Sequence, residues 1–389
     1  MLRHLVLFIA LEVYGQQVFY VNLNNGPQVF QIYVGNPKQE LYAAFSLELS
    51  NTIFLDNHCA LRPKCCRYCN DETFSAMYCV AACQFIYATK NLVCNPEKGD
   101  YQSLPYYLTD SRTFELLNKP IWNSRTWFTD SLSGRFFVDQ LVLVADDFNQ
   151  MKNLEIENAV MIEGSFLDQV LFYDIDALVG FGLGENNIIQ QLYAQNKIPS
   201  PVIHLSLNST IFSYGLLKIG AYGEDSCVYW SEHNTQNNNR WVLEVENVEL
   251  NGVRYEKKVK ALITNHVNNV SLPSNFMNEL VGANVLKTFN DTESLIYDSD
   301  FYFDCDRPLE LHMTVDGRRL TISNPLLQQS QINDTHCLPY INQIGSLRYS
   351  TDVDMILGWP FLNRFCISFD YDKLTIRIAK NIRCNLYLC

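Results

Sequence analysis

Cysteine is the residue type whose spacing points most directly to chemistry in this chain. Seven of the 13 cysteines lie between residues 59 and 94, and the spacings Cys66-x-x-Cys69 and Cys79-x-x-x-Cys83 are typical of zinc sites. In an oxidising compartment, the same cluster indicates disulfides instead. We therefore interpret residues 59–99 as a disulfide-stapled insert, which either protects the chain or binds a partner, and we expect no metal and no cofactor.

The odd number of cysteines leaves one thiol without a partner in the chain. Cys389, at the end of the sequence, is the candidate for a disulfide to another protein. Cys366 lies in an apolar strand and is the candidate for a buried free thiol.

The compartment follows from the start of the sequence. Arg3 and His4 precede a short apolar run, and the chain turns polar near Gly15, which predicts a signal peptide over residues 1–15. No later stretch is long and apolar enough to span a bilayer. The net charge of −13 and the pI of about 5.0 disfavour nucleic acids and anionic membranes as partners. We expect a secreted, extracellular protein.

Glycosylation sequons agree with secretion. We expect glycans on Asn208, Asn290 and Asn333, and none on Asn269, which lies inside a loop that we expect to be packed.

The elements that position these residues are mostly strands. The chain has 389 residues, which suits two domains, and its 23 Phe and 22 Tyr favour strands. Short runs such as 29–34 and 216–219 end at glycine and predict strands joined by turns. Helical patterns are rare, and residues 187–195 and 273–281 are the better candidates.

An internal repeat organises the strands. An apolar strand over residues 43–50 runs into a loop, and a glycine-broken apolar strand follows at 176–182. The second half repeats this order at 261–266 and 355–359. The repeat predicts two duplicated lobes that face each other, with any chemistry between them.

Five segments in this order resemble those of the pepsin-like aspartic proteases. They are residues 31–39, 133–142, 176–184, 356–364 and 369–370. The resemblance implies an all-β, bilobal pepsin-like acid protease fold, with two related β-barrel-like lobes around a central cleft. We expect the N-terminal lobe over residues 16–198 and the C-terminal lobe over 199–389. The resemblance also implies a disulfide between Cys305 and Cys337.

The residues of the family's catalytic loops are replaced. Members use one Asp-Thr-Gly loop per lobe, and the two carboxylates share a proton. By alignment, the first loop here reads Ser46-Leu47-Glu48. The second loop reads Thr264-Asn265-His266, so all six positions differ. We expect Ser46 and Thr264, at the aspartate positions, to hydrogen-bond to each other, and Glu48 and His266 to pair or to be solvated.

The flap over the site also departs from the family. Trp127 stands where members have a tyrosine, and Phe128 stands where they have a glycine. These two residues could fill the cleft. Together with the changed loops, they predict a non-catalytic protein that binds a peptide or protein, in the cleft or at the cysteine-rich insert.

Two alternatives stay open. The chain could be an active aspartic-type endopeptidase with a displaced site. Ser46, His266 and Glu48 are also the residue types of a nucleophilic triad, although Glu48 is only two residues from Ser46 and we expect His266 on the opposite lobe.

Overall fold

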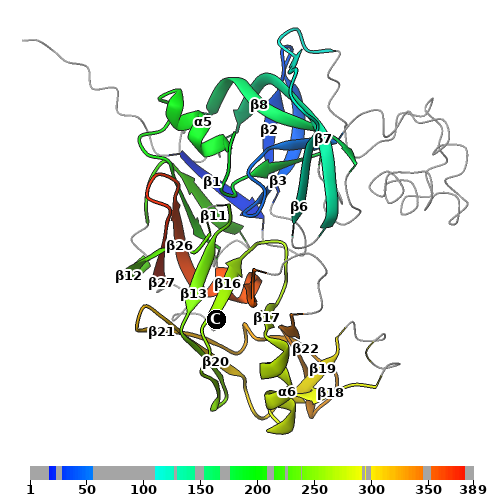
Figure 1. The fold of residues 1–389 in the computed structure, drawn as a ribbon, viewed down its shortest axis with the longest axis vertical. Coiled ribbons are helices and arrows are strands. Elements are labelled where there is room, and N and C mark those ends of the chain that lie inside the picture. Colours follow the sequence, from blue (N-terminus) through cyan, green and yellow to red (C-terminus); the bar gives the residue numbers. More distant parts are fainter. Residues whose placement is uncertain are drawn as a thin grey trace, which may run out of the picture.

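A computed structural model describes residues 17–22, 29–55, 110–126, 129–144, 153–166, 176–207, 214–223, 227–237, 239–290, 294, 299–344 and 352–381. The predicted signal peptide, the cysteine-rich insert, Trp127, Phe128, Asn208 and Cys389 lie outside these residues. Figure 1 shows one large sheet at one end of the molecule and the strands of the second half, with helix α6, at the other end.

The first half builds an eight-stranded sheet in the order β2-β3-β9-β4-β8-β7-β5, with β6 paired to β7. Its strands are β2 (Val29–Val34), β3 (Gln39–Ser46), β4 (Ile53–Leu55), β5 (Glu115–Leu116), β6 (Trp122–Thr126), β7 (Thr129–Leu143), β8 (Leu154–Phe166) and β9 (Ala177–Gly180). In β3, four consecutive residues from Ala43 to Ser46 are buried. This apolar run explains why β3 lies inside the sheet and not at its edge.

The second half builds a five-stranded sheet in the order β13-β16-β25-β17-β24. Its strands are β13 (Val242–Val245), β16 (Val259–Ile263), β25 (Met355–Leu357), β17 (Val270–Leu272) and β24 (Ile341–Gln343). Two four-stranded sheets accompany it. One contains β15 (Val253–Tyr255), β14 (Asn247–Leu250), β20 (Glu310–Val315) and β21 (Arg318–Ser323), and the other contains β18 (Lys287–Thr288), β19 (Phe301–Asp304), β23 (His336–Pro339) and β22 (Gln328–Gln331).

A six-stranded sheet connects the two halves. Its order is β1 (Gln17–Asn22), β11 (Tyr214–Ile219), β10 (Val202–Ser206), β26 (Phe365–Asp370), β27 (Thr375–Asn381) and β12 (Cys227–Asn234). Strand β1 pairs antiparallel with β11, so the start of the chain joins a sheet that is otherwise made by residues after 198. The division after residue 198 stays a prediction.

The repeat read from the sequence is present in the pairing. Strand β3 runs parallel to β9, as β16 runs parallel to β25. Next to these, β4 is antiparallel to β9 and parallel to β8, as β17 is antiparallel to β25 and parallel to β24. The fold is therefore all-β and bilobal, with the same strand arrangement in each lobe.

The helices are short. The two predicted helices form as α5 (Ile188–Ala194) and α6 (Ser274–Gly282). Helix α5 begins at Asn187, whose side chain accepts hydrogen bonds from the N–H groups of Ile189 and Gln190. Helix α8 (Trp359–Arg364) was not predicted, since a six-residue segment is too short to show a helical period. No helix among these residues is long and apolar enough to cross a membrane.

Aromatic residues fill the core between the two halves. The rings of Phe45 and Phe181 lie 5.8 Å apart, and the ring of Trp241 lies 4.9 Å from that of Phe369. The carbonyl of Phe181 accepts hydrogen bonds from Trp241 Nε1 at 3.1 Å and from the Tyr371 hydroxyl at 2.6 Å. This contact fixes β9 and its loop against the second half of the chain.

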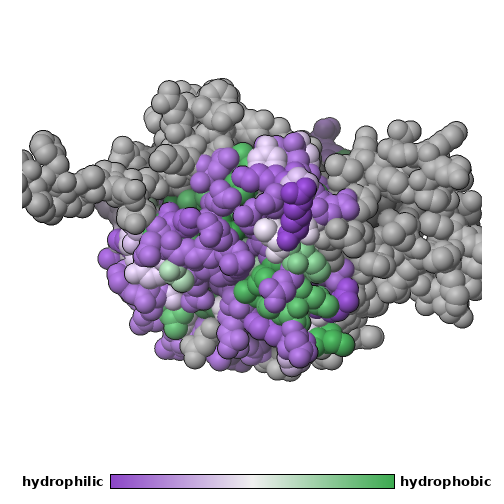
Figure 2. Space-filling view, turned by 90° about the horizontal axis from the view of Figure 1, so that it is seen from above, coloured by the Kyte–Doolittle hydropathy of each residue, from purple (hydrophilic) through white to green (hydrophobic). Residues whose placement is uncertain are grey.

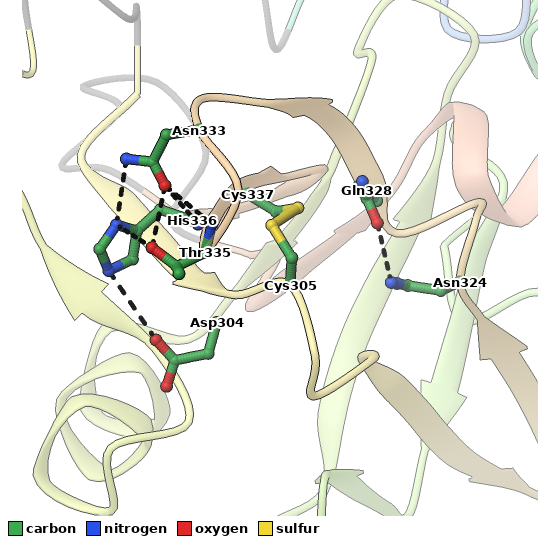
Figure 3. The surroundings of a disulfide bond; sticks show 8 residues. All are labelled: Asp304, Cys305, Asn324, Gln328, Asn333, Thr335, His336 and Cys337. Atoms are coloured by element: carbon green, nitrogen blue, oxygen red, sulfur yellow. Dashed lines mark hydrogen bonds and ion pairs between the residues drawn. A yellow bond between two sulfur atoms is a disulfide. The ribbon is translucent and has the colours of Figure 1, made fainter.

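Two disulfides lie in the described residues. Cys305 bonds Cys337, the pair that the family resemblance implies (Figure 3). Cys227 bonds Cys366, which joins β12 to β26. The interpretation of Cys366 as a free thiol was therefore wrong. The two sulfurs come from positions 139 residues apart, and only the folded sheet brings them together.

Candidate active site

The two loops that replace Asp-Thr-Gly start at matching points of the repeat. Ser46 is the last residue of β3, and Thr264 directly follows β16. Both residues are fully buried. Each loop is also tied to the neighbouring glycine-marked strand, because Phe181 N donates to Ser46 O at 2.7 Å and Thr264 N donates to Leu357 O at 3.2 Å. The repeat thus places Ser46 and Thr264 in equivalent positions.

Ser46 is held by three contacts. Its Oγ accepts hydrogen bonds from the backbone N–H groups of Glu48 at 3.2 Å and Leu49 at 3.0 Å. The same Oγ lies 2.8 Å from His266 Nε2 of the opposite lobe. Because the two amides already donate to Oγ, the Ser46 hydroxyl has its own proton left to donate, and we assign that hydrogen bond to His266 Nε2. The expected hydrogen bond between Ser46 and Thr264 does not form, and Thr264 Oγ1 instead accepts from the backbone N–H of His266 at 3.2 Å.

His266 is neutral in this position. Part of the residue is still accessible to solvent, but burial lowers its pKa from 6.5 to about 3. Glu48 is also buried, with 8% of its surface exposed, so of the two expectations for Glu48 and His266 full solvation does not hold, and their pairing stays a prediction.

Asn265 connects the lobes. Its Nδ2 donates to Phe45 O at 2.7 Å, and its Oδ1 accepts from Leu47 N at 3.0 Å. One amide side chain thus satisfies two buried backbone groups of the first loop. Leu47 is the middle residue of the first loop, as Asn265 is of the second. Its side chain is apolar and fully buried in the hydrophobic core. Sequence reasoning missed this role, although an amide, like the threonine it replaces, can both donate and accept.

The predicted glycosylation positions differ in exposure. Asn290 and Asn333 are exposed, whereas Asn269 is partly buried and its Oδ1 accepts from Ser271 Oγ at 3.2 Å. Figure 3 shows Asn333 beside the Cys305–Cys337 disulfide, with its Oδ1 accepting from Thr335 N and His336 N, both at 2.9 Å. The flap residues Trp127 and Phe128 cannot be placed, since they lie outside the described part of the chain.

The described residues contain one candidate metal group. His204, Cys227 and Cys366 have their donor atoms within 4.8 Å of one another. The two sulfurs already form a disulfide, so they are not thiolate ligands in this state. Burial, with a smaller contribution from Lys218, lowers the pKa of His204 to about 3.

Comparison with known families agrees with the fold. The family model described as eukaryotic aspartyl protease matches residues 29–381. The chain therefore belongs to the eukaryotic aspartyl protease family. A search of curated proteins finds no match.

Proposed function

We propose that this chain is a secreted, proteolytically inactive aspartyl protease homologue that binds a peptide or protein. The observation that carries the proposal is the pair Ser46 and Thr264, both fully buried at the ends of β3 and β16. Aspartic proteolysis needs two adjacent carboxyl groups, one charged to activate water and one protonated to polarise the scissile carbonyl. Two alcohols cannot divide these tasks, because neither ionises near neutral or acidic pH.

The contacts around Ser46 support the same proposal. Two backbone amides and His266 occupy the hydrogen-bonding capacity of its Oγ. A water molecule positioned for attack would have to displace one of these partners. The loops therefore act as a bracing contact between the lobes.

Exposed apolar residues support a binding role. The large exposed apolar side chains of the described residues include Leu116 at 45% and Ile121 at 67%. Both precede the hairpin β6–β7, which corresponds to the flap of the family. Figure 2 shows that apolar residues also gather in one place on the face at the top of the molecule, amid a mostly hydrophilic surface. Apolar surface of this kind favours a protein or peptide partner.

The alternative is a peptidase with a displaced site. The 2.8 Å contact between Ser46 Oγ and His266 Nε2 favours this alternative. A serine hydroxyl can act as a nucleophile, and the neutral ring of His266, on the opposite lobe, could act as its base. The complete burial of Ser46 opposes it, since the carbonyl of a substrate has to reach the Oγ atom.

A calorimetric titration tests the binding half of the proposal. The probe is a transition-state peptide inhibitor of aspartyl proteases, added to the purified full-length chain. We expect saturable binding that Ile121→Ser weakens. The control is Tyr193→Ser, a change at an exposed aromatic residue on α5, which should leave binding unchanged. Absence of saturable binding, or equal binding by both variants, would remove the support for a peptide-binding surface at this hairpin.

A further inference from the structure

Strand β12 carries a serine–histidine contact that lies outside the two loops. Ser231 and His233 are two residues apart, so they lie on the same face of the strand. Ser231 Oγ is 2.7 Å from His233 Nε2. His233 Nδ1 is 2.6 Å from Asp316 Oδ2, and Asp316 lies in the turn between β20 and β21. A serine, a histidine and an aspartate thus form one continuous chain of hydrogen bonds.

The ring nitrogens have the roles that nucleophilic catalysis requires. The Asp316 carboxylate accepts the proton of Nδ1, which leaves Nε2 as the acceptor that faces the serine hydroxyl. The carbonyl of Ile378 is a second acceptor for the Ser231 proton, at the longer distance of 3.3 Å. His233 is buried, with 3% of its surface exposed, so the ring is held between its two partners.

The backbone beside Ser231 is irregular. The pairing of β12 with β27 shifts between Val228 and Ser231, so a bulge directly precedes the serine. Within the bulge, Tyr229 has φ 61°, which is uncommon for a bulky residue, and 82% of its surface is exposed. Bulges and strained residues of this kind gather next to functional sites, where they redirect side chains. Tyr229 lies two residues before Ser231 in the chain.

Ser231 lies at the edge of a sheet. Strand β12 is the last strand of its sheet in the described chain (Figure 1). Ser231 keeps 8% of its surface accessible, whereas Ser46 keeps none. So little accessible surface leaves no room for a polypeptide at the serine, so the substrate considered below is a small ester.

We propose that Ser231, His233 and Asp316 form a nucleophilic triad that takes an acyl group from small aryl or alkyl esters. Ser231 Oγ attacks the ester carbonyl carbon while His233 Nε2 takes the hydroxyl proton. The bond from the carbonyl carbon to the alcohol oxygen then breaks, and the proton passes to the departing alcohol. Water releases the acid in the reverse sequence and restores the serine. This activity is independent of the binding proposed for the aspartyl protease fold.

A labelling experiment tests the triad in the purified full-length protein. The probe is a small fluorophosphonate, whose fluoride is displaced by an activated serine, and the labelled residue is located by mass spectrometry. We expect label on Ser231, no label on the buried Ser46, and none on the exposed Ser330 of β22, which reports on non-specific reaction. We also expect 4-nitrophenyl acetate to release a burst of one nitrophenolate per chain.

Two variants separate catalysis from a structural role. Ser231→Ala should lose both the label and the burst. Asp316→Asn changes a side chain that is 70% exposed, so the fold is expected to persist, while the labelling rate should fall at least about tenfold because the amide can hold the histidine in the wrong tautomer. Thermal unfolding checks the fold of each variant. Absence of label on Ser231 in the folded protein, or equal labelling of Asp316→Asn, would overturn the proposal.

Discussion

At the scale of single residues, Asn265 shows how a changed loop keeps the lobes together. Its amide satisfies Phe45 O and Leu47 N, two backbone groups that are buried between the lobes. A buried backbone group without a partner costs about 1–3 kcal/mol, so the position is constrained even without catalysis. The hydrogen bonds between the two loops therefore contribute to the stability of the contact between the lobes.

Variants of Asn265 test how much its two hydrogen bonds stabilise the fold. Asn265→Val is apolar and should lower the free energy of unfolding by about 2–5 kcal/mol, because both backbone groups lose their partner. Asn265→Thr, of similar shape to valine, keeps a donor and an acceptor and should retain most of the stability. Urea unfolding measures both values, and equal losses for the two variants would show that the side-chain hydrogen bonds contribute little.

His266 makes stability depend on pH. Its folded-state pKa is about 3 because of burial, below the value of about 6.5 in the unfolded chain. Between these values the unfolded state binds more protons, so stability is complete above about pH 6.5 and is lost as pH falls towards 3, by at most about 1.4 kcal/mol per pH unit. Buried His204, with a pKa of about 3, adds a loss of the same sign.

The measurement is urea unfolding of the wild type and of His266→Gln at pH 7 and pH 4. Glutamine can still bond Ser46 but does not titrate, so the variant should lose less stability than the wild type between the two values. Equal losses would mean that His266 is not desolvated in the folded protein.

At the scale of elements, glycine determines how closely the end of a strand can approach each of the two loops that replace Asp-Thr-Gly. A Cβ atom on Gly358, directly after β25, would overlap the carbonyl oxygens of Val267 and Asn269. The first lobe repeats this arrangement, since a Cβ on Gly182, just after β9, would meet Glu48 O. The glycines therefore let each loop rest on its neighbouring strand.

Gly358→Ala should destabilise the protein by several kcal/mol, on the order of 3, because backbone atoms must move to admit the methyl group. Gly282→Ala is the control: it lies at the end of α6, and a Cβ there has nothing within 4 Å. Alanine is the better helix former, so this change should be neutral or slightly stabilising. Thermal unfolding compares the two, and a tolerated Gly358→Ala would contradict the close approach.

The sequence predicted the elements better than their contacts. Apolar runs and glycines identified β3, β9, β16 and β25, because each is a local pattern. The Ser46–His266 contact and the Cys227–Cys366 bond join residues that lie far apart in the chain, and no local pattern records such pairs. The triad of Ser231, His233 and Asp316 left one local signal, a serine and a histidine on the same face of a strand, but its aspartate comes from a distant turn.

At the scale of the whole molecule, the six-stranded sheet holds the two halves together. It combines β1 from the start of the chain with β26 and β27 from its end. The Cys227–Cys366 disulfide crosses this sheet and closes a loop of 139 residues. A crosslink over so long a loop restricts the unfolded chain strongly.

Replacing Cys227 and Cys366 together by alanine should lower the free energy of unfolding by about 2–5 kcal/mol. The single variant Cys366→Ala should cost at least as much, because it also leaves a reactive thiol at Cys227. Guanidinium unfolding under non-reducing conditions gives the values. An unchanged midpoint in the double variant would show that the crosslink contributes little to stability.

The central claim is that an aspartyl protease fold has been kept without its proteolytic activity. Incubation of the highly purified chain with a denatured protein at acidic pH, with and without a transition-state peptide inhibitor, tests this claim most directly. We predict no cleavage that the inhibitor suppresses. Inhibitor-sensitive cleavage that copurifies with the chain, and that disappears in a Ser46→Ala or Glu48→Gln variant, would contradict it.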